Sequence, residues 1–83
     1  MASEPYHWCA HQAAVEVLVR FRQKERKGIL DMLQRTCNSP FDIESQIFTL
    51  PNEAPFHVVA VESRVLTLQI DHAAKEVLLL ALE

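Results

Sequence analysis

Histidine and cysteine side chains are the residues of this chain that are best suited to chemistry. His7, Cys9 and His11 share one side of the segment if residues 7–11 are extended, because side chains alternate along a strand. Imidazole and thiolate are donors that zinc and copper prefer, and Cys37 would supply a fourth ligand. The ligand spacings of structural zinc sites are absent, and His11 stands where a helix is expected to begin. We therefore expect no metal and no other cofactor, but a buried cysteine flanked by surface histidines.

A Cys–His nucleophilic pair is the second chemistry that these residue types suggest. Cys9 or Cys37 beside a histidine would need a third group that orients the base, and the sequence supplies no such group. Two cysteines are also too few for a disulfide framework. We see no signal-peptide pattern at the N-terminus, so we expect both thiols to be reduced and buried.

Basic side chains gather in one short stretch, which we call the basic segment: Arg20, Arg22, Lys24, Arg26 and Lys27. The net charge is −3, but residues 1–41 carry six Lys or Arg against four Asp or Glu, and residues 42–83 carry two against seven. A protein that depends on attraction to phosphates is usually basic overall. Two interpretations stay open: a solvated corner between two helices, or a surface that contacts nucleic acid or an acidic partner.

The composition predicts a single domain that spans residues 1–83. A hydrophobic fraction of 49% is enough for a real core. Gly28 is the only glycine, which excludes a glycine-rich phosphate loop or a dinucleotide fingerprint. The longest apolar run, residues 77–82, is far shorter than the ~20 residues of a membrane helix. We expect a cytoplasmic protein with no membrane partner.

Hydrophobic periodicity predicts a strand, two helices and then three strands. A short aromatic stretch opens the chain, and helical spacing of apolar residues follows it. Joints short enough for hairpins separate the last three strands. Between the helices and these strands we expect an irregular connection with one short strand. The expected boundaries are residues 6–10 for the first strand, residue 11 onward and 23–36 for the helices, 47–50 for the short strand, and 56–62, 65–71 and 76–82 for the last three. This order predicts a two-layer α+β domain: an N-terminal strand, a helical hairpin and an antiparallel β-meander.

The last three strands carry more apolar residues than one buried face needs. A two-layer domain buries one face of its sheet and leaves the other polar, yet strict alternation here puts apolar side chains on both faces. The residues that we expect on the uncovered face, as a partner-binding surface, are Val59, Val61, Leu78, Leu80 and Leu82. Such a patch on a small protein indicates a protein partner or a second copy of the chain. The alternative is that residues 41–55 fold over this face.

The element order and several positions resemble the RelE/ParE superfamily, the toxins of bacterial type II toxin–antitoxin systems (the plasmid stabilisation family). The likeness covers nearly the whole chain, and within the meander it includes a turn with arginine, Ser63-Arg64, and an aliphatic last strand. The other positions that carry it are Ala14 and Leu18 in the first helix, Arg26, Ile29 and Leu33 in the second, and Pro40 after it. The resemblance implies a RelE/ParE-like fold and a cognate antitoxin as partner.

The resemblance also implies two kinds of target. Ribosome-dependent members cleave messenger RNA with basic side chains on the meander, which stabilise the charge that develops on the phosphate. At matching positions this chain offers Arg64 and His57 as catalytic residues, with the basic segment against ribosomal RNA. Most of the basic set is missing, so enzymatic activity stays open. The ParE-like branch binds DNA gyrase and does not need that set. The alternative is a catalytically inactive relative that serves as an interaction module or homodimer.

Overall fold

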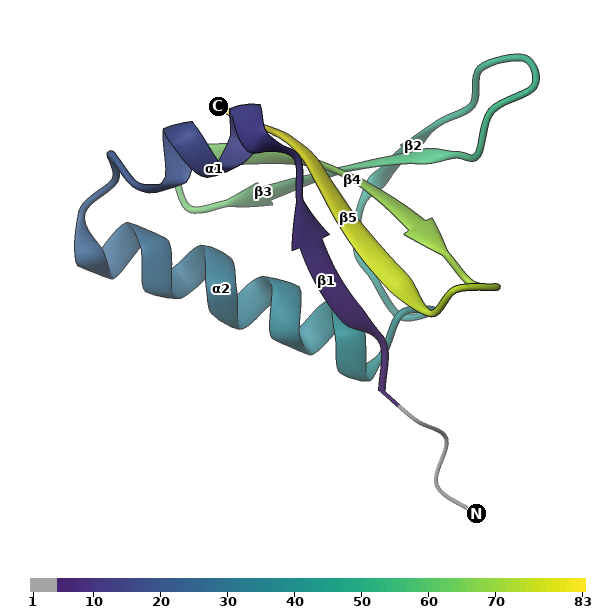
Figure 1. The fold of residues 1–83 in the computed structure, drawn as a ribbon, viewed down its shortest axis with the longest axis horizontal. Helices are drawn as coiled ribbons and strands as arrows, with labels where there is room; N and C mark the ends of the chain where they lie inside the picture. Colours follow the sequence, from purple (N-terminus) through teal and green to yellow (C-terminus); the bar gives the residue numbers. More distant parts are fainter. Residues whose placement is uncertain (1–4) are drawn as a thin grey trace.

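The computed structural model describes residues 5–83, and it confirms the predicted α+β class and element order (Figure 1). The elements are β1 (His7–Ala10), α1 (Gln12–Leu18), α2 (Gln23–Asn38), β2 (Gln46–Phe48), β3 (Phe56–Val61), β4 (Arg64–Asp71) and β5 (Glu76–Leu82). The short strand in the connection exists, although it begins one residue earlier than expected and ends two residues earlier. The second helix runs two residues beyond its predicted end.

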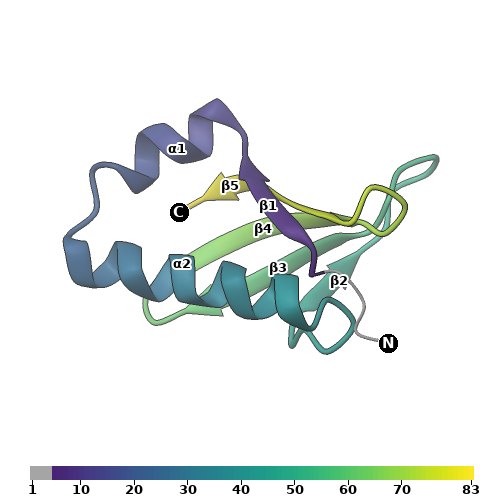
Figure 2. The same cartoon turned by 60° about the horizontal axis from the view of Figure 1, so that its bottom comes forward.

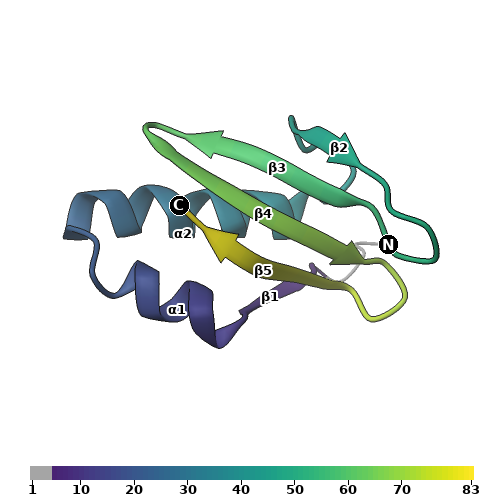
Figure 3. The same ribbon diagram turned by 90° about the horizontal axis from the view of Figure 1, so that it is seen from above.

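The strands form one five-stranded sheet in the order β1-β5-β4-β3-β2. The antiparallel meander β3–β4–β5 forms as predicted and lies at the centre of the sheet, and β2 extends it as an antiparallel edge strand. At the other edge β1 pairs with β5 in parallel, so the sheet is mixed. The two helices lie on one side of this sheet, which leaves its other face without a helix among residues 5–83 (Figures 2 and 3).

Helix α2 packs as its sequence predicts, whereas α1 buries Ala14 and Leu18 but leaves Val15 and Val19, which its apolar spacing also placed on the stripe, exposed. The imidazole Nδ1 of His11 accepts a hydrogen bond from the N–H of Ala13 at 3.2 Å, which caps the first turn of α1. Helix α2 buries one stripe at helical spacing against the sheet: Ile29, Met32, Leu33, Thr36 and Cys37. The hydroxyl of Thr36 donates to the carbonyl of Met32 at 2.9 Å, so the polar atom in this stripe is satisfied. This stripe fixes α2 over the sheet.

The covered face of the sheet differs from the face that strict alternation predicts. The buried strand residues are Val59, Leu66, Leu68, Ile70, Val77, Leu79 and Leu82. In an antiparallel ladder, residues directly opposite each other point to the same side, and Val59 lies opposite Leu66. Val59 is therefore in the core, where only 8% of it is exposed. Val61 is half-buried and packs against the same core.

A β-bulge explains why Leu82 also faces the helices. Thr67 lies opposite Ala81 but Leu68 lies opposite Leu79, which leaves Leu80 as an extra residue in β5. The extra residue reverses the alternation, so Leu79 and Leu82 are both buried. The prediction that Val59, Val61 and Leu82 share an uncovered face with Leu78 and Leu80 is wrong, because the β3–β4 register places Val59 and Val61 on the covered side and the bulge places Leu82 there. The prediction depended on alternation within single strands and not on the pairing between them.

The open face is instead lined by the residues that lie between the buried ones. Register places Phe56 and Leu78 opposite Gln69, and Val58 opposite Thr67. All five side chains are half-buried and mix apolar with neutral polar groups. Residues 41–55 do not cover this face. They form β2 at the sheet edge and a loop that projects beyond it (Figure 1), tied to the face by a hydrogen bond from the Gln69 side chain to the Ala54 carbonyl at 3.1 Å.

Candidate functional site

Arg64, the arginine predicted to be catalytic, points to the helices. Its Nε donates to Oε2 of Glu25 at 2.8 Å, and its guanidinium carbon lies 4.0 Å from the centre of the Phe21 ring. The hydrogen bond to Arg64 is the main reason that the pKa of Glu25 is lowered, so this carboxylate is charged at neutral pH. Arg64 thus joins the β3–β4 hairpin to the start of α2. A guanidinium held in this way is turned from the open face of the sheet.

His57 lies in a separate environment, near the start of β3. Its Nδ1 is 2.9 Å from the hydroxyl oxygen of Ser45, and its ring is half-buried. Burial and, to a smaller extent, the charge of His72 lower the pKa of His57, so the imidazole is neutral at pH 7. A neutral imidazole can accept a proton as a general base if a substrate reaches it.

The structure does not bring His57 and Arg64 together. Arg64 lies opposite Val61, and His57 is four residues before Val61 on β3, which is about 13 Å along a strand. Sequence reasoning placed both residues on the meander correctly, but it could not show that they lie at opposite ends of one ladder.

The basic segment forms the corner between α1 and the first turns of α2. Four of its side chains are exposed, and Arg26 is half-buried, with Nη1 3.3 Å from the carbonyl oxygen of Val19. The corner also receives Arg64 through its contacts with Glu25 and Phe21. Positive charge is therefore concentrated at this end of the protein. Within the described strands, Arg64 is the only lysine or arginine.

An aromatic cluster that the sequence did not reveal joins three segments that are far apart in the chain. The Tyr6 hydroxyl lies 2.8 Å from Nδ1 of His72, and the Phe41 ring stacks on the same imidazole with centroids 4.5 Å apart. His72 is exposed as expected for a turn residue, but these two contacts hold it in place. The contact between Tyr6 and His72 spans 66 positions in the sequence, and neither periodicity nor spacing predicts such a distant pair.

The cysteines are separate and poorly suited to nucleophilic chemistry. Cys9 is half-buried on β1, Cys37 is buried on α2, and both thiols are free. Burial raises the pKa of both thiols, and the neighbouring Glu76 raises that of Cys9 further. A raised pKa disfavours the reactive thiolate. In residues 5–83, no three His, Cys, Asp or Glu side chains are grouped so that they could hold a metal ion.

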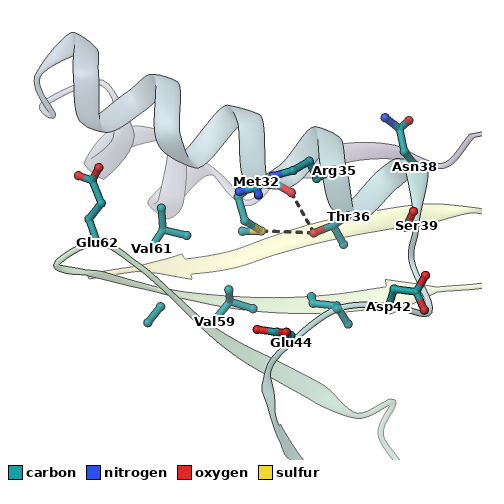
Figure 4. A pocket seen from close by; sticks show the side chains of 12 residues that line it. Met32, Arg35, Thr36, Asn38, Ser39, Asp42, Glu44, Val59, Val61 and Glu62 are labelled. Carbon is teal, nitrogen blue, oxygen red and sulfur yellow. Dashed lines mark hydrogen bonds between the residues drawn. The ribbon is translucent and has the colours of Figure 1, made fainter.

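Helix α2, β3 and the loop after α2 enclose a groove with a cavity volume of about 740 Å³ (Figure 4). Apolar side chains form its floor, among them Met32, Ile43 and Val59. Thr36 points toward the groove but its hydroxyl is bonded within the helix. Carboxylates from the flanking loops and one arginine, Arg35, line the rim. The rim of this groove is more acidic than basic.

Comparison with solved structures finds the same fold in toxin–antitoxin complexes, although in sequence the chain matches no protein-family model and no curated protein. The archaeal RelE–RelB complex from Pyrococcus horikoshii OT3 matches with a TM-score of 0.83 at 12% identity, over 96% of this chain and 94% of that chain. The toxin–antitoxin complex RelBE2 from Mycobacterium tuberculosis matches with a TM-score of 0.78 at 12% identity, over 95% and 90%. The intact E. coli RelBE complex matches with a TM-score of 0.75 at 14% identity, over 93% of each chain. The predicted resemblance to the RelE/ParE superfamily is confirmed as a likeness of fold.

Within residues 5–83, no helix is long and apolar enough to cross a membrane.

Proposed function

We propose that this chain is the toxin-type component of a type II toxin–antitoxin pair, neutralised by a cognate antitoxin in the cytoplasm. The observation that supports this most is the likeness to three solved toxin–antitoxin complexes, each of which covers at least 93% of the chain. The small size of the domain and the mixed apolar character of its open face agree with a protein that works through a partner.

The proposed mode of action is binding of a target rather than cleavage of RNA. Cleavage needs preorganised positive groups around the phosphate. Arg64, the only arginine or lysine in the described strands, is hydrogen-bonded to Glu25 on the covered side of the sheet. His57 is about 13 Å away from it along the β3–β4 ladder. DNA gyrase is therefore the favoured target, with the basic segment and Leu78 and Leu80 as candidate contacts. Cleavage of ribosome-bound messenger RNA by Arg64 and His57 is the competing version.

A second candidate is a non-toxic relative that acts as an interaction module or homodimer. The observation that favours it is the apolar edge of the sheet, where Ile47, Phe48 and Leu50 are 62%, 53% and 51% exposed. A short apolar edge strand offers unpaired backbone groups to another chain. A stable homodimer that buries these three side chains would support this candidate over the first.

Induced expression in a bacterium tests the proposal. We expect growth to stop on induction, and co-expression of the protein encoded by the adjoining gene to restore it. The matched control is the same vector with the chain truncated before β5, which removes the strand that joins β1 to β4. Growth that continues at full expression of folded protein would contradict a toxin function.

A further inference from the structure

The end of α2, the start of β1 and the turn between β4 and β5 border another concave feature, with a cavity volume of about 530 Å³. These three segments lie at one end of the protein (Figure 2). Two backbone hydrogen bonds hold them together: the N–H of Tyr6 donates to the carbonyl of Cys37 at 3.0 Å, and the N–H of His7 donates to the carbonyl of Lys75 at 3.1 Å. We call this feature the aromatic hollow, because Tyr6 and Phe41 line it. Its volume lies in the range of ~300–1,000 Å³ that is typical of ligand pockets.

Phe41 is exposed to water but held in place. It is 77% exposed, which is the highest value among the large hydrophobic residues of the described chain. One face of its ring stacks on His72, with an interplanar angle of 5°, and the Tyr6 hydroxyl holds His72 from another side at 2.8 Å. Phe41 lines the hollow whereas His72 does not, so the free face of the Phe41 ring borders the hollow. Such a ring favours stacking of a planar ligand, because it loses little further freedom on binding.

Lys75 supplies the positive charge of the hollow. Its φ of 54° lies in the left-handed region, which residues with a Cβ seldom adopt. Strained backbone of this kind is concentrated at functional sites such as ligand clamps, where the surrounding structure holds it. Here the hydrogen bond from His7 to the Lys75 carbonyl holds it. No carboxylate of residues 5–83 lies within ion-pair distance of the Lys75 ammonium, so this group can bind an anion such as a phosphate.

The polar side of the hollow combines a donor with an acceptor. Asn38 and Asp42 line it, from the end of α2 and the loop that follows. The Oδ1 of Asn38 accepts a hydrogen bond from Nε2 of Gln34 at 3.3 Å, which leaves the N–H groups of the Asn38 amide for a ligand. The ionised carboxylate of Asp42 only accepts. Guanine matches this pair, because its O6 accepts and its neighbouring N1–H and N2–H groups donate along one edge.

We propose that the aromatic hollow binds a free guanine mononucleotide. The base stacks on the free face of Phe41, its hydrogen-bonding edge meets Asn38 and Asp42, and its phosphate pairs with Lys75. The site is separate from the basic segment, because α2 begins at that segment and ends at the hollow, about 22 Å further along its axis. None of these four residues is a proposed contact for gyrase or RNA, so nucleotide binding goes beyond the proposed function.

Titration of the isotope-labelled full chain with guanosine monophosphate, followed by amide chemical shifts, tests the proposal. We expect saturable shifts at Phe41, Asp42 and Lys75, with a Kd below about 1 mM. Inosine monophosphate lacks only the 2-amino group and guanosine lacks only the phosphate, so each should bind about tenfold more weakly. Three results would each overturn the proposal: no saturable binding in this range, equal affinities for the three ligands, or shifts confined to the basic segment.

Matched variants assign the contacts. Phe41→Ala should weaken binding of guanosine monophosphate by about tenfold, because stacking is lost, whereas Phe48→Ala removes an exposed ring outside the hollow and should leave binding unchanged. Lys75→Gln should weaken binding of the monophosphate but not of guanosine, and Lys24→Gln in the basic segment should affect neither. Asp42→Asn should abolish the preference for guanosine monophosphate over inosine monophosphate. Equal losses within either pair of variants, or an unchanged preference in Asp42→Asn, would overturn the proposal.

Single-stranded RNA is the other source of a guanine nucleotide. Among the described residues that line the hollow, Lys75 is the only lysine or arginine, so the further phosphates of an RNA chain would find no partner there. We therefore expect a short RNA of uridines with one central guanosine to bind no more tightly than guanosine monophosphate. Tighter binding of this RNA would overturn the assignment to a free nucleotide.

Discussion

Leu82 and Leu78 are leucines of the same strand for which the structure predicts different costs of truncation. Leu82 is 5% exposed and lies opposite Leu66 on the covered face, whereas Leu78 is half-buried opposite Gln69 on the open face. We expect Leu82→Ala to lower the free energy of unfolding by about 2–5 kcal/mol, because it removes buried methyl groups and leaves a cavity. For Leu78→Ala we expect about 1 kcal/mol, because much of that side chain already contacts water.

This difference is large on the scale of the whole domain. At roughly 0.05–0.15 kcal/mol per residue, the chain has about 4–12 kcal/mol of stability in total. Guanidinium unfolding followed by far-ultraviolet circular dichroism measures both variants against the parent chain. In thermal unfolding, Leu82→Ala should lower the midpoint by about 8 °C or more. Equal losses for the two variants, or a larger loss for Leu78→Ala, would show that strict alternation sets the faces and would refute the register produced by the bulge at Leu80.

Three further substitutions test the contacts of the candidate site. Arg64→Gln should leave growth arrest intact at equal protein level, because the Arg64 guanidinium is bonded to Glu25 and is not used for cleavage in this account. Loss of growth arrest in this variant, while it remains folded, would support cleavage of RNA. Gly28→Ala should raise the free energy of unfolding by roughly 1 kcal/mol, because a Cβ there would lie 3.8 Å from Cγ1 of Val61, an ordinary contact; a lower melting temperature would contradict this. Because the pKa of His57 is lowered in the folded state, its neutral form stabilises the fold; this contribution to the free energy of unfolding is complete above the unfolded pKa of about 6.5 and is lost as the pH falls toward the folded pKa. His57→Gln should therefore flatten the fall of the free energy of unfolding with decreasing pH, as measured by denaturant titrations at several pH values. An unchanged dependence on pH would exclude His57 as the source of this fall.

The sequence predicted the elements because each depends on local patterns. The apolar stripe of α2 has helical spacing, and the joints of the meander are short enough for hairpins. The sequence did not predict the parallel pairing of β1 with β5, since a strand of four residues carries little information about its neighbour. It also did not predict the bulge at Leu80, because β5 is apolar on both sides and its alternation cannot reveal an inserted residue.

The candidate site was predictable in residue type but not in geometry. Arg64 and His57 lie on the meander as expected, yet the orientation of Arg64 depends on Glu25 and Phe21, which come from another part of the chain. The groove beside α2 depends on the residue at which pairing with β3 begins, Gln46, and no spacing in the sequence marks that point. Contacts between distant segments decided both features.

Induced expression in a bacterium, with primer-extension mapping of a reporter messenger RNA and a parallel gyrase supercoiling assay, tests the proposed function most directly. The structure leads us to expect growth arrest with intact messenger RNA and inhibited supercoiling, because Arg64 and His57 are apart and the strands carry no other lysine or arginine. Arrest accompanied by cuts at codon spacing would contradict this account and would identify a ribosome-dependent nuclease.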